Sequence, residues 1–370
     1  MNKIDQYRKK IDGLDWKILS LLSERGKTAR TIGRIKKKSG GIVLVPDREQ
    51  AIYDRLSRIN RGPYKNEAVL SIFREIVSAT RALQAPLKIA FLGPEATFTH
   101  IAAVEHFGSS AEMMPQGSIQ NIFEEVERRH ADFGVVPVEN STEGMISHTL
   151  DMFVDTDLSI SSEIVLRVQH HLLSREPNLK NIRVVYSHPH ALAQCQRWLS
   201  VNLPHARQKG VDSTAAAARM AAHEKKSAAS RAPAAGRASA AIASELAASR
   251  YGLTILKREI QDQLKNFTRF LVLGRGESKR TGRDKTSLLL GLKDEAGALY
   301  KILSPLAQAG INLTKIESRP LKSRAWEYVF FVDLDGHVSD KAIARVVEKV
   351  RRRCTLFKVL GSYPKSRIAS

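Results

Sequence analysis

The chain has 370 residues, which is long enough for two or three domains, each with its own hydrophobic core. No apolar run approaches the ~18 residues of a membrane span, and the charged start of the sequence lacks the apolar core of a secretory signal. The two cysteines, Cys195 and Cys354, are too few for a disulfide framework. We therefore expect a protein of the reducing cytoplasm.

The formal net charge of +21 and the isoelectric point near 10.0 favour an anionic partner. Nucleic acid, an acidic membrane surface and small anionic substrates all meet this description. About half of the surplus lies in residues 1–86, and the rest is spread along the chain. We expect most of these charges to form a solvated basic surface and a minority to bind substrate carboxylates.

Residues 1–86 have the apolar periodicity of helices. We expect a long helix over about 2–38, a second from 46 to 62 and a third from 64 to 84. Three helices of which one is this long do not pack into a compact domain on their own, because the two shorter helices cannot cover the long one. The pattern therefore predicts pairing with another chain.

Several polar residues of these helices have related positions. Arg25 and Lys36 are eleven residues apart, so they fall within roughly 20° of each other on an ideal helix. Arg8 points elsewhere, and this misfit argues against its serving the same pocket within one chain. Thr80 and Gln84 share one face of the third helix. Taken singly, each Lys or Arg would more often belong to a solvated helix face.

The ordered set of these residues resembles the all-helical chorismate mutases across residues 1–86. The matching positions are Arg8, Arg25, Lys36, Arg48, Glu49, Thr80 and Gln84. The resemblance implies two intertwined chains, with Arg8 reaching the partner's site. The reaction is a pericyclic rearrangement of a dicarboxylate, which needs a compact substrate conformer and cations near the ether oxygen.

The same resemblance implies a role for each residue. Arg8, Arg25 and Arg48 would bind carboxylates, Lys36 and Gln84 would face the ether oxygen, and Glu49 would face the ring hydroxyl. Two positions depart from the family: Val45 stands where some members are acidic, and Thr80 where a serine is found. Neither change removes a cation, so we expect activity to survive.

Residues 87–275 alternate short β-rich runs with helical stretches, a pattern that predicts an α/β domain with a largely parallel sheet. The Ala-, Ser- and Lys/Arg-rich residues 223–239 are expected to form an exposed loop. Five segments in order resemble prephenate dehydratases: 93–100, 135–144, 186–195, 212–218 and 266–270. The resemblance implies a two-lobed domain like a periplasmic binding protein. Ala96 and Thr99 replace the more usual Gly and Ser, with a small expected effect on backbone approach.

A prephenate dehydratase must bind two carboxylates and donate a proton to the departing hydroxide. The family places the proton donation on the threonine that is Thr268 here. Asn140 with Ser141, and Ser213 with Thr214, are expected to precede helices whose amides bind carboxylates. Further candidate substrate ligands are Ser187, His188 and Arg269. On a strand, however, Arg269 would point away from its neighbour Thr268, because successive residues face opposite sides.

Each of these residues also has an ordinary interpretation. Asn140, Ser141 and Ser213 are common helix caps, and His188, which precedes a proline, is a common loop residue. His170 and His171 face opposite sides of a strand, so we expect a hydrogen-bonded core histidine rather than a metal pair. No Cys/His spacing predicts zinc and no phosphate-binding loop is present, so we expect neither a metal nor a nucleotide cofactor.

Residues 284–365 have the order βαββαβ, which predicts a ferredoxin-like α+β domain. The segments 297–300 and 317–320 resemble the phenylalanine-binding ACT domains. The resemblance implies feedback inhibition by phenylalanine, bound by Gly297, Ala298, Leu299, Glu317, Ser318, Arg319 and Pro320. A purely structural dimerisation unit is the alternative.

The sequence as a whole thus predicts a multidomain, bifunctional enzyme that converts chorismate through prephenate to phenylpyruvate, as a homodimer or homotetramer. One alternative makes the helical domain a silent dimerisation arm, and another replaces prephenate by arogenate. A third is a ligand-sensing nucleic-acid regulator, but no helix-turn-helix pattern supports it.

Overall fold

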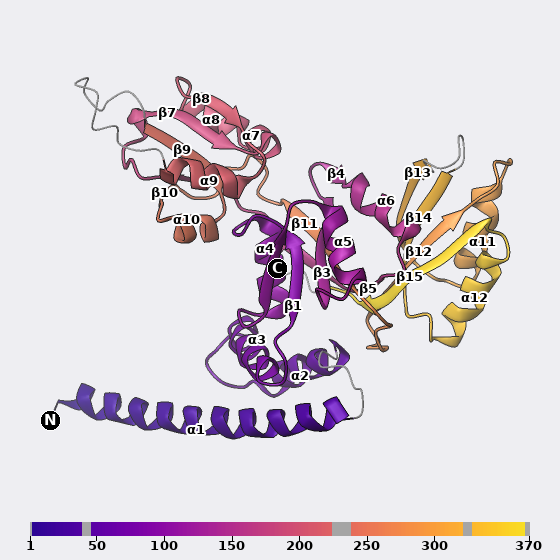
Figure 1. Ribbon diagram of the computed structural model, residues 1–370, viewed down its shortest axis with the longest axis horizontal. Helices are drawn as coiled ribbons and strands as arrows, with labels where there is room; N and C mark the ends of the chain where they lie inside the picture. Colours follow the sequence, from indigo (N-terminus) through magenta and orange to yellow (C-terminus); the bar gives the residue numbers. More distant parts are fainter. Residues whose placement is uncertain (1, 39–45, 224–237, 321–327, 367–370) are drawn as a thin grey trace. The chain divides into compact units, whose positions relative to one another are not determined.

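The computed structural model describes residues 2–38, 46–223, 238–320 and 328–366 (Figure 1). The chain divides into two compact units, which we describe separately. The first contains the residues up to Lys88 together with Val104–Glu112, and the second contains Ile89–Ala103 and the residues from Met113 onward. Among the described helices, none combines the length and apolar character needed to cross a bilayer.

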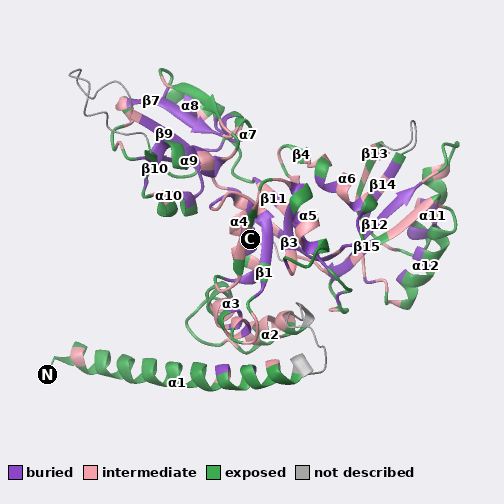
Figure 2. Ribbon diagram, in the orientation of Figure 1, coloured by how far each residue is buried: buried purple, intermediate pink, exposed green. Residues whose placement is uncertain are grey.

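The first unit is built on three helices: α1 (Lys3–Lys38), α2 (Pro46–Ile59) and α3 (Asn66–Ala82). Helix α3 packs against both α1 and α2. Figure 2 shows α1 exposed along most of its length. Its first two-thirds carry exposed apolar side chains: Ile4, Tyr7, Ile11, Leu14, Trp16, Ile18, Leu19, Leu21 and Leu22. The expected three helices are confirmed, and these apolar side chains are left exposed by the described residues of the unit.

The second unit begins with a sheet of order β2-β1-β3-β11-β5, to which β4 is added beside β3. Its strands are β1 (Lys88–Leu92), β2 (Glu112–Gln116), β3 (Phe133–Asn140), β4 (Gly144–Met145), β5 (Ser159–Arg167) and β11 (Phe267–Gly274). Helices α4 (Phe98–Phe107), α5 (Ile119–Glu127) and α6 (Ser147–Asp155) accompany them.

A second sheet has the order β10-β6-β9-β7-β8. Its strands are β6 (His171–Ser174), β7 (Ile182–Ser187), β8 (Arg207–Gly210), β9 (Ala238–Ala243) and β10 (Thr254–Lys257). The short helix η1 (Leu179–Asn181) and helices α7 (Pro189–Gln194), α8 (Gln196–Asn202), α9 (Thr214–His223) and α10 (Glu245–Tyr251) connect them. The chain passes between the two sheets after β5 and again before β11, which gives the expected two lobes.

The expectation of a largely parallel sheet was wrong. Strands β1 and β3 are parallel, as are β7, β8 and β9, but β11 runs antiparallel to both β3 and β5. Strand β6 is likewise antiparallel to β9 and β10. The reason is the double crossing: a strand that returns from the other lobe enters the first sheet from its opposite end. Most of the loop expected at 223–239 lies outside the described residues.

The C-terminal part of this unit forms an antiparallel sheet of order β13-β14-β12-β15. Its strands are β12 (Asp284–Gly291), β13 (Leu313–Pro320), β14 (Tyr328–Asp335) and β15 (Leu356–Pro364), with helices α11 (Ala298–Gln308) and α12 (Lys341–Arg351). The order confirms the ferredoxin-like arrangement.

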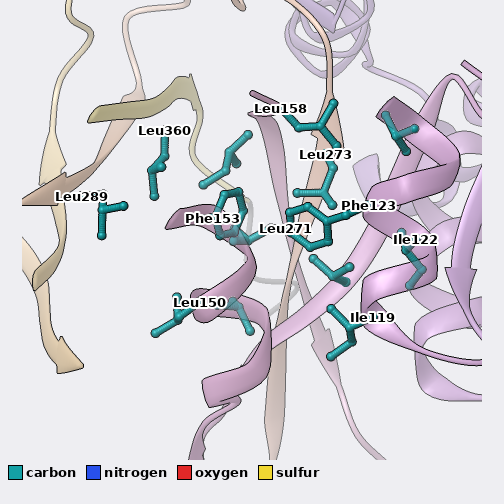
Figure 3. Packing of buried hydrophobic residues seen from close by; sticks show 14 of the residues in the cluster. Ile119, Ile122, Phe123, Leu150, Phe153, Leu158, Leu271, Leu273, Leu289 and Leu360 are labelled. Atoms are coloured by element: carbon teal, nitrogen blue, oxygen red, sulfur yellow. The ribbon is translucent and has the colours of Figure 1, made fainter. Parts of the chain in front are cut away.

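This sheet shares an apolar core with the first sheet of the dehydratase-like region. Figure 3 shows Leu289 and Leu360 facing Phe153 and Leu271, and these four side chains belong to one buried cluster. Tyr363 of β15 is fully buried in the same cluster. Hydrophobic burial therefore fixes the C-terminal sheet against β5 and α6.

Candidate active sites

A polar cluster lies where α1 and α3 meet. The guanidinium of Arg25 donates hydrogen bonds to Thr80 Oγ1 and, over 3.4 Å, to the carbonyl of Ile76. Gly33 gives Gln84 room beside α1, because a Cβ at this position would lie 2.8 Å from Gln84 Cγ. The Oε1 atom of Gln84 is buried and has no hydrogen-bond partner within the described residues. The cluster thus offers a cation and a free amide oxygen.

Helix α2 adds a carboxylate whose partner the sequence analysis missed. Glu49 Oε1 lies 2.6 Å from Arg81 Nη1, and both side chains are largely buried. Arg81 also donates to the carbonyl of Phe107. Burial, followed by the nearby Glu49 charge, raises the pKa of Tyr53 to about 12. The position of Arg81 in the sequence could have indicated this role, because it follows Thr80 directly in the last turn of α3.

Within one chain, the structure does not bring Arg8 to this cluster. The side chain of Arg8 is 74% exposed, and its ion-pair partner among the described residues is Asp5 in its own turn, at 3.4 Å. At 1.5 Å per residue, Arg8 lies about 25 Å along α1 from Arg25. Arg48 is exposed at the start of α2. The side chain of Lys36 and the whole of Val45 lie outside the described residues.

The second unit contains a cavity of about 860 Å³, within the usual range for small-ligand sites. We call it the interlobe cavity, because residues of both lobes line it. The first lobe contributes Thr97, Phe98, Thr99, Asn140 and Thr268, and the second contributes His170, His188, Gln194, Ser213, Thr214 and Arg219. The cavity therefore brings together five of the residues predicted from the dehydratase resemblance.

Hydrogen bonds fix the orientation of the Asn140 amide. Its Oδ1 accepts from the backbone N–H groups of Thr142 and Glu143, at 3.0 and 3.2 Å. Its Nδ2 must then donate, and it does so to Asn266 Oδ1 over 2.9 Å and to Thr268 Oγ1 over 2.8 Å. Because Thr268 accepts this bond, its own hydroxyl proton is left for another acceptor, and the residue lines the cavity.

The amide chain continues into the second lobe through residues that the sequence analysis did not assign to the site. Asn266 Nδ2 donates to Gln194 Oε1 over 2.9 Å, and Gln194 Nε2 donates to Glu143 Oε1 over 2.7 Å. The signal was available, since Asn266 opens one dehydratase-like segment and Gln194 stands near the end of another.

His170 ends this chain of hydrogen bonds. Its Nε2 lies 2.9 Å from Gln194 Oε1, which can only accept, so the proton resides on Nε2. Burial lowers the pKa of His170 to about 4, and its buried Nδ1 has no partner within the described residues. The hydrogen-bonded histidine expected from the sequence is thus confirmed. Groups of three His, Cys, Asp or Glu side chains able to hold a metal are absent from the described residues.

Two further predicted residues form the wall of the cavity. Ser213 Oγ accepts from the backbone N–H of Ala216 at 3.0 Å, and Thr214 begins α9 directly after it. His188 caps α7, its Nδ1 accepting from the N–H of His190 at 3.3 Å. Burial, and next His190, lower the pKa of His188. Ser213 and His188 therefore act as helix caps and line the cavity at the same time.

Ser141 and Ser187 do not line the cavity. Ser141 Oγ accepts from the N–H of Phe267 at 2.9 Å and so joins β3 to β11. Ser187 is fully buried and donates to the carbonyl of Ile242 at 2.7 Å. The expected helix after Asn140 was also wrong: β3 is followed by a turn and by β4, and the next helix begins only at Ser147.

Arg269 likewise lies away from the cavity, on the opposite face of β11. Its guanidinium contacts Glu163 at 2.8 Å and Asp333 at 2.7 Å. Burial opposes its charge, but Tyr363, Asp333 and Glu163 together raise the pKa of Arg269. Among the described residues that line the cavity, Arg219 of α9 is the only Lys or Arg. Arg219, five residues after Thr214, is therefore the better candidate for a carboxylate ligand.

Ala96 differs from glycine in more than size. Its φ is +67°, in the left-handed region that favours glycine, and the residue is buried. The effect expected from the sequence concerned only how closely a ligand can approach the backbone. The structure adds a conformational cost of about 1 kcal/mol for the methyl group at this position.

The residues expected to bind phenylalanine lie on two elements of the C-terminal sheet region. Gly297 has a φ of +78° and precedes α11, whose first two residues are Ala298 and Leu299. The segment 317–320 ends β13, where half-buried and exposed residues alternate. Arg319 is half-buried and contacts Asp151 of α6 at 3.6 Å, so it faces the dehydratase-like region, whereas Ser318 is exposed.

Comparison with known proteins agrees with this three-part organisation. The family models for chorismate mutase type II, prephenate dehydratase and the ACT domain match residues 7–85, 89–278 and 286–352. A bifunctional chorismate mutase/prephenate dehydratase of Aquifex aeolicus is 47% identical over 370 residues, covering 99% of each chain. Its counterpart in Pseudomonas aeruginosa is 42% identical over 371 residues, covering 99% of this chain and 98% of the relative.

Among solved structures, prephenate dehydratase from Arthrobacter aurescens, crystallised with L-Phe, is 34% identical with a TM-score of 0.67. It aligns over 75% of this chain and 90% of its own.

The fold and the two sites define a multidomain enzyme for small anionic substrates, with a cationic helical site, an interlobe cavity and a ferredoxin-like ACT domain. More particularly, the chain belongs to the family of bifunctional chorismate mutase/prephenate dehydratases.

Proposed function

We propose that this chain rearranges chorismate to prephenate, converts prephenate to phenylpyruvate, and is inhibited by L-phenylalanine. We assign these tasks to residues 1–86, 87–275 and 284–365, respectively. The observation that carries the proposal is the Thr268 hydroxyl, which lines an 860 Å³ cavity and accepts from Asn140, so that its proton is free for a leaving group.

In the dehydratase step, the bond from the ring to its carboxylate breaks and carbon dioxide leaves. The released electron pair completes the aromatic ring, and the ring hydroxyl departs with a proton as water. Thr268 supplies this proton to the departing oxygen, and a proton from solvent water then restores the Thr268 hydroxyl. The substrate carboxylates are bound by Arg219 and by the amides at the start of α9. His188 forms part of the wall of the cavity. The chemistry requires no cofactor.

In the mutase step, no proton moves. Arg25 and Arg48 bind carboxylates, and Lys36 and Gln84 face the ether oxygen, where negative charge develops. Glu49 faces the ring hydroxyl. The ion pair with Arg81, at 2.6 Å, fixes the position of the Glu49 carboxylate. Thr80 orients Arg25, with which it shares a hydrogen bond.

A second copy of the chain completes the mutase site. Arg8 is about 25 Å along the helix from Arg25, so only another chain can bring such a residue to the pocket. The exposed apolar side chains of α1 provide the surface on which two copies pair. We therefore propose a homodimer or a homotetramer. The small number of cysteines supports placing it in the cytoplasm.

The ACT domain binds phenylalanine through Gly297, Ala298 and Leu299 on one side and Glu317, Ser318 and Pro320 on the other. The left-handed Gly297 lets a ligand approach the start of α11. The contact of Arg319 with Asp151 then connects this segment to the dehydratase-like region.

The test is formation of phenylpyruvate from chorismate and, separately, from prephenate, each with and without phenylalanine. Turnover of both substrates, suppressed by phenylalanine, supports all three assignments. Turnover of prephenate alone makes the helical region an assembly device. A preference for arogenate changes the substrate, and failure with all three substrates by folded protein contradicts the proposal.

A further inference from the structure

Two neighbouring strands carry catalytic residues on one face and charged residues on the other. In the pairing of β3 with β11, Thr268 lies opposite Asn140 and Arg269 lies opposite Glu139. Successive residues of a strand face opposite sides, so Asn140 and Thr268 meet the interlobe cavity, while Glu139 and Arg269 meet the ACT sheet. The same two dipeptides therefore belong to both regions.

The ACT sheet presents a matching pair of charges. Lys315 and Asp333 lie opposite each other on β13 and β14. Lys315 Nζ is 2.5 Å from Glu139 Oε2, and Asp333 Oδ2 is 2.7 Å from Arg269 Nη1. We call these four residues, of alternating charge, the charge clamp. The charge clamp consists of the pair Glu139 and Arg269 from the first sheet and the pair Lys315 and Asp333 from the C-terminal sheet.

The surroundings of the charge clamp make it rigid. The side chains of Arg269, Asp333 and Lys315 are 12%, 9% and 15% exposed, whereas that of Glu139 is 38% exposed. The buried Glu163 contacts both Arg269 and Lys285, each at 2.8 Å. Displacing one partner of a largely buried ion pair leaves the other charge uncompensated, so a movement of one partner is costly unless the other follows.

The charge clamp also lies close to the proposed effector segment. Lys315 and Glu317 both belong to β13 and are two residues apart, so they lie on the same face of the strand. A change in the position of β13 therefore acts on Lys315, and through it on Glu139 and its neighbour Asn140.

We propose that the charge clamp transmits phenylalanine binding from the ACT domain to the hydrogen bond between Asn140 and Thr268. This inference rests on the proposed function. A shift of β13 alters the Lys315–Glu139 pair, the backbone of β3 follows, and the donor that orients the Thr268 hydroxyl moves. Coupling of this kind has a typical size of about 5- to 150-fold in affinity or activity.

The experiment compares Lys315→Met, Glu139→Gln and the double variant with Lys301→Met in the full-length chain. Lys301 pairs with Glu295 at 2.8 Å on an exposed part of the ACT domain, so it is a matched control. Three quantities are measured: prephenate turnover without effector, phenylalanine binding by calorimetry, and the phenylalanine concentration that halves turnover.

We expect Lys315→Met and Glu139→Gln to bind phenylalanine while inhibition weakens by about fivefold or more. The double variant should be no worse than either single one, because both remove the same pair. Lys301→Met should remain as sensitive as the wild type. A loss of stability alone would leave the ratio between binding and inhibition unchanged.

Undiminished inhibition in both clamp variants overturns the inference. So does a parallel loss of phenylalanine binding and inhibition, since this places Lys315 in the effector site itself. If wild-type turnover is insensitive to phenylalanine, the proposed regulation fails first, and the result is distinguishable because it appears before any substitution is made.

Discussion

The two candidate active sites of this chain are built in opposite ways. The mutase cluster lies on helices that leave α1 largely exposed, and one of its expected cations, Arg8, is about 25 Å along the helix from Arg25. The interlobe cavity is lined by two lobes of one chain, with Thr268 buried in its wall. Under the proposed function, the mutase site needs a second copy of the chain, whereas described residues of one chain line the interlobe cavity from both lobes.

The chemistry explains this difference. A pericyclic rearrangement needs only placed charges and a compact substrate, and under the proposed function long Arg and Lys side chains would supply these charges from a subunit interface. Loss of a hydroxide with carbon dioxide needs a donor of fixed direction, and the amides of Asn140, Asn266 and Gln194 provide that direction from several segments. Orienting the donor hydroxyl of Thr268 therefore requires the more enclosed site, the interlobe cavity.

The sharpest way to break this comparison is to remove the oriented hydroxyl. We expect Thr268→Val to lower kcat for prephenate by about 10²- to 10⁴-fold, because the departing oxygen loses its donor. Chorismate mutase activity, measured as loss of chorismate, should be unchanged. Thr268→Ser is the control and should retain most activity. If Thr268→Val keeps more than a tenth of wild-type turnover, another group donates the proton.

A second test concerns the shared mutase site. Arg8→Ala and Arg25→Ala should each lower mutase activity on the order of 10²-fold, with prephenate turnover intact. When the two variants are mixed and allowed to exchange subunits, heterodimers contain one intact site. About a quarter of wild-type mutase activity should therefore return, half of the dimers being mixed and half of their sites intact. No recovery despite exchange would place Arg8 outside the partner's site.

A third prediction concerns the enclosed site and pH. His170 has a pKa of about 4 when folded, against 6.5 unfolded, so the unfolded chain binds more protons between these values. The free energy of unfolding should therefore fall by about 3 kcal/mol as the pH drops from 6.5 to 4. Denaturant titrations across this range measure it. His170→Gln should flatten this part of the profile; an equally steep profile would exclude His170 as its source.

The smallest expected effect is that of replacing Ser187, which tests whether this residue has a structural or a substrate-binding role. Ser187→Ala removes a buried donor to the carbonyl of Ile242 and should lower the free energy of unfolding by about 1–3 kcal/mol. The KM for prephenate should not change, because Ser187 does not line the interlobe cavity. Thermal unfolding and steady-state kinetics test both statements. A raised KM with unchanged stability would return Ser187 to the binding site.

Much of this organisation followed from the sequence alone. Helical periodicity predicted the three N-terminal helices, and the order of strands and helices predicted the ferredoxin-like domain, because both depend on local spacing. Ordered motifs indicated the family, and alternation along a strand correctly warned that Arg269 would face away from Thr268. The angular misfit of Arg8 was also local information.

Only the tertiary structure decided which distant segments meet. Asn140 and Thr268 are 128 residues apart, and their bond depends on β11 entering the first sheet antiparallel, which no local pattern predicts. Other long-range contacts gave Arg269 its partners Glu163 and Asp333, and brought His170 and Gln194 to the cavity. Spacing determines the faces of an element, but the packing of distant elements determines what each face contacts.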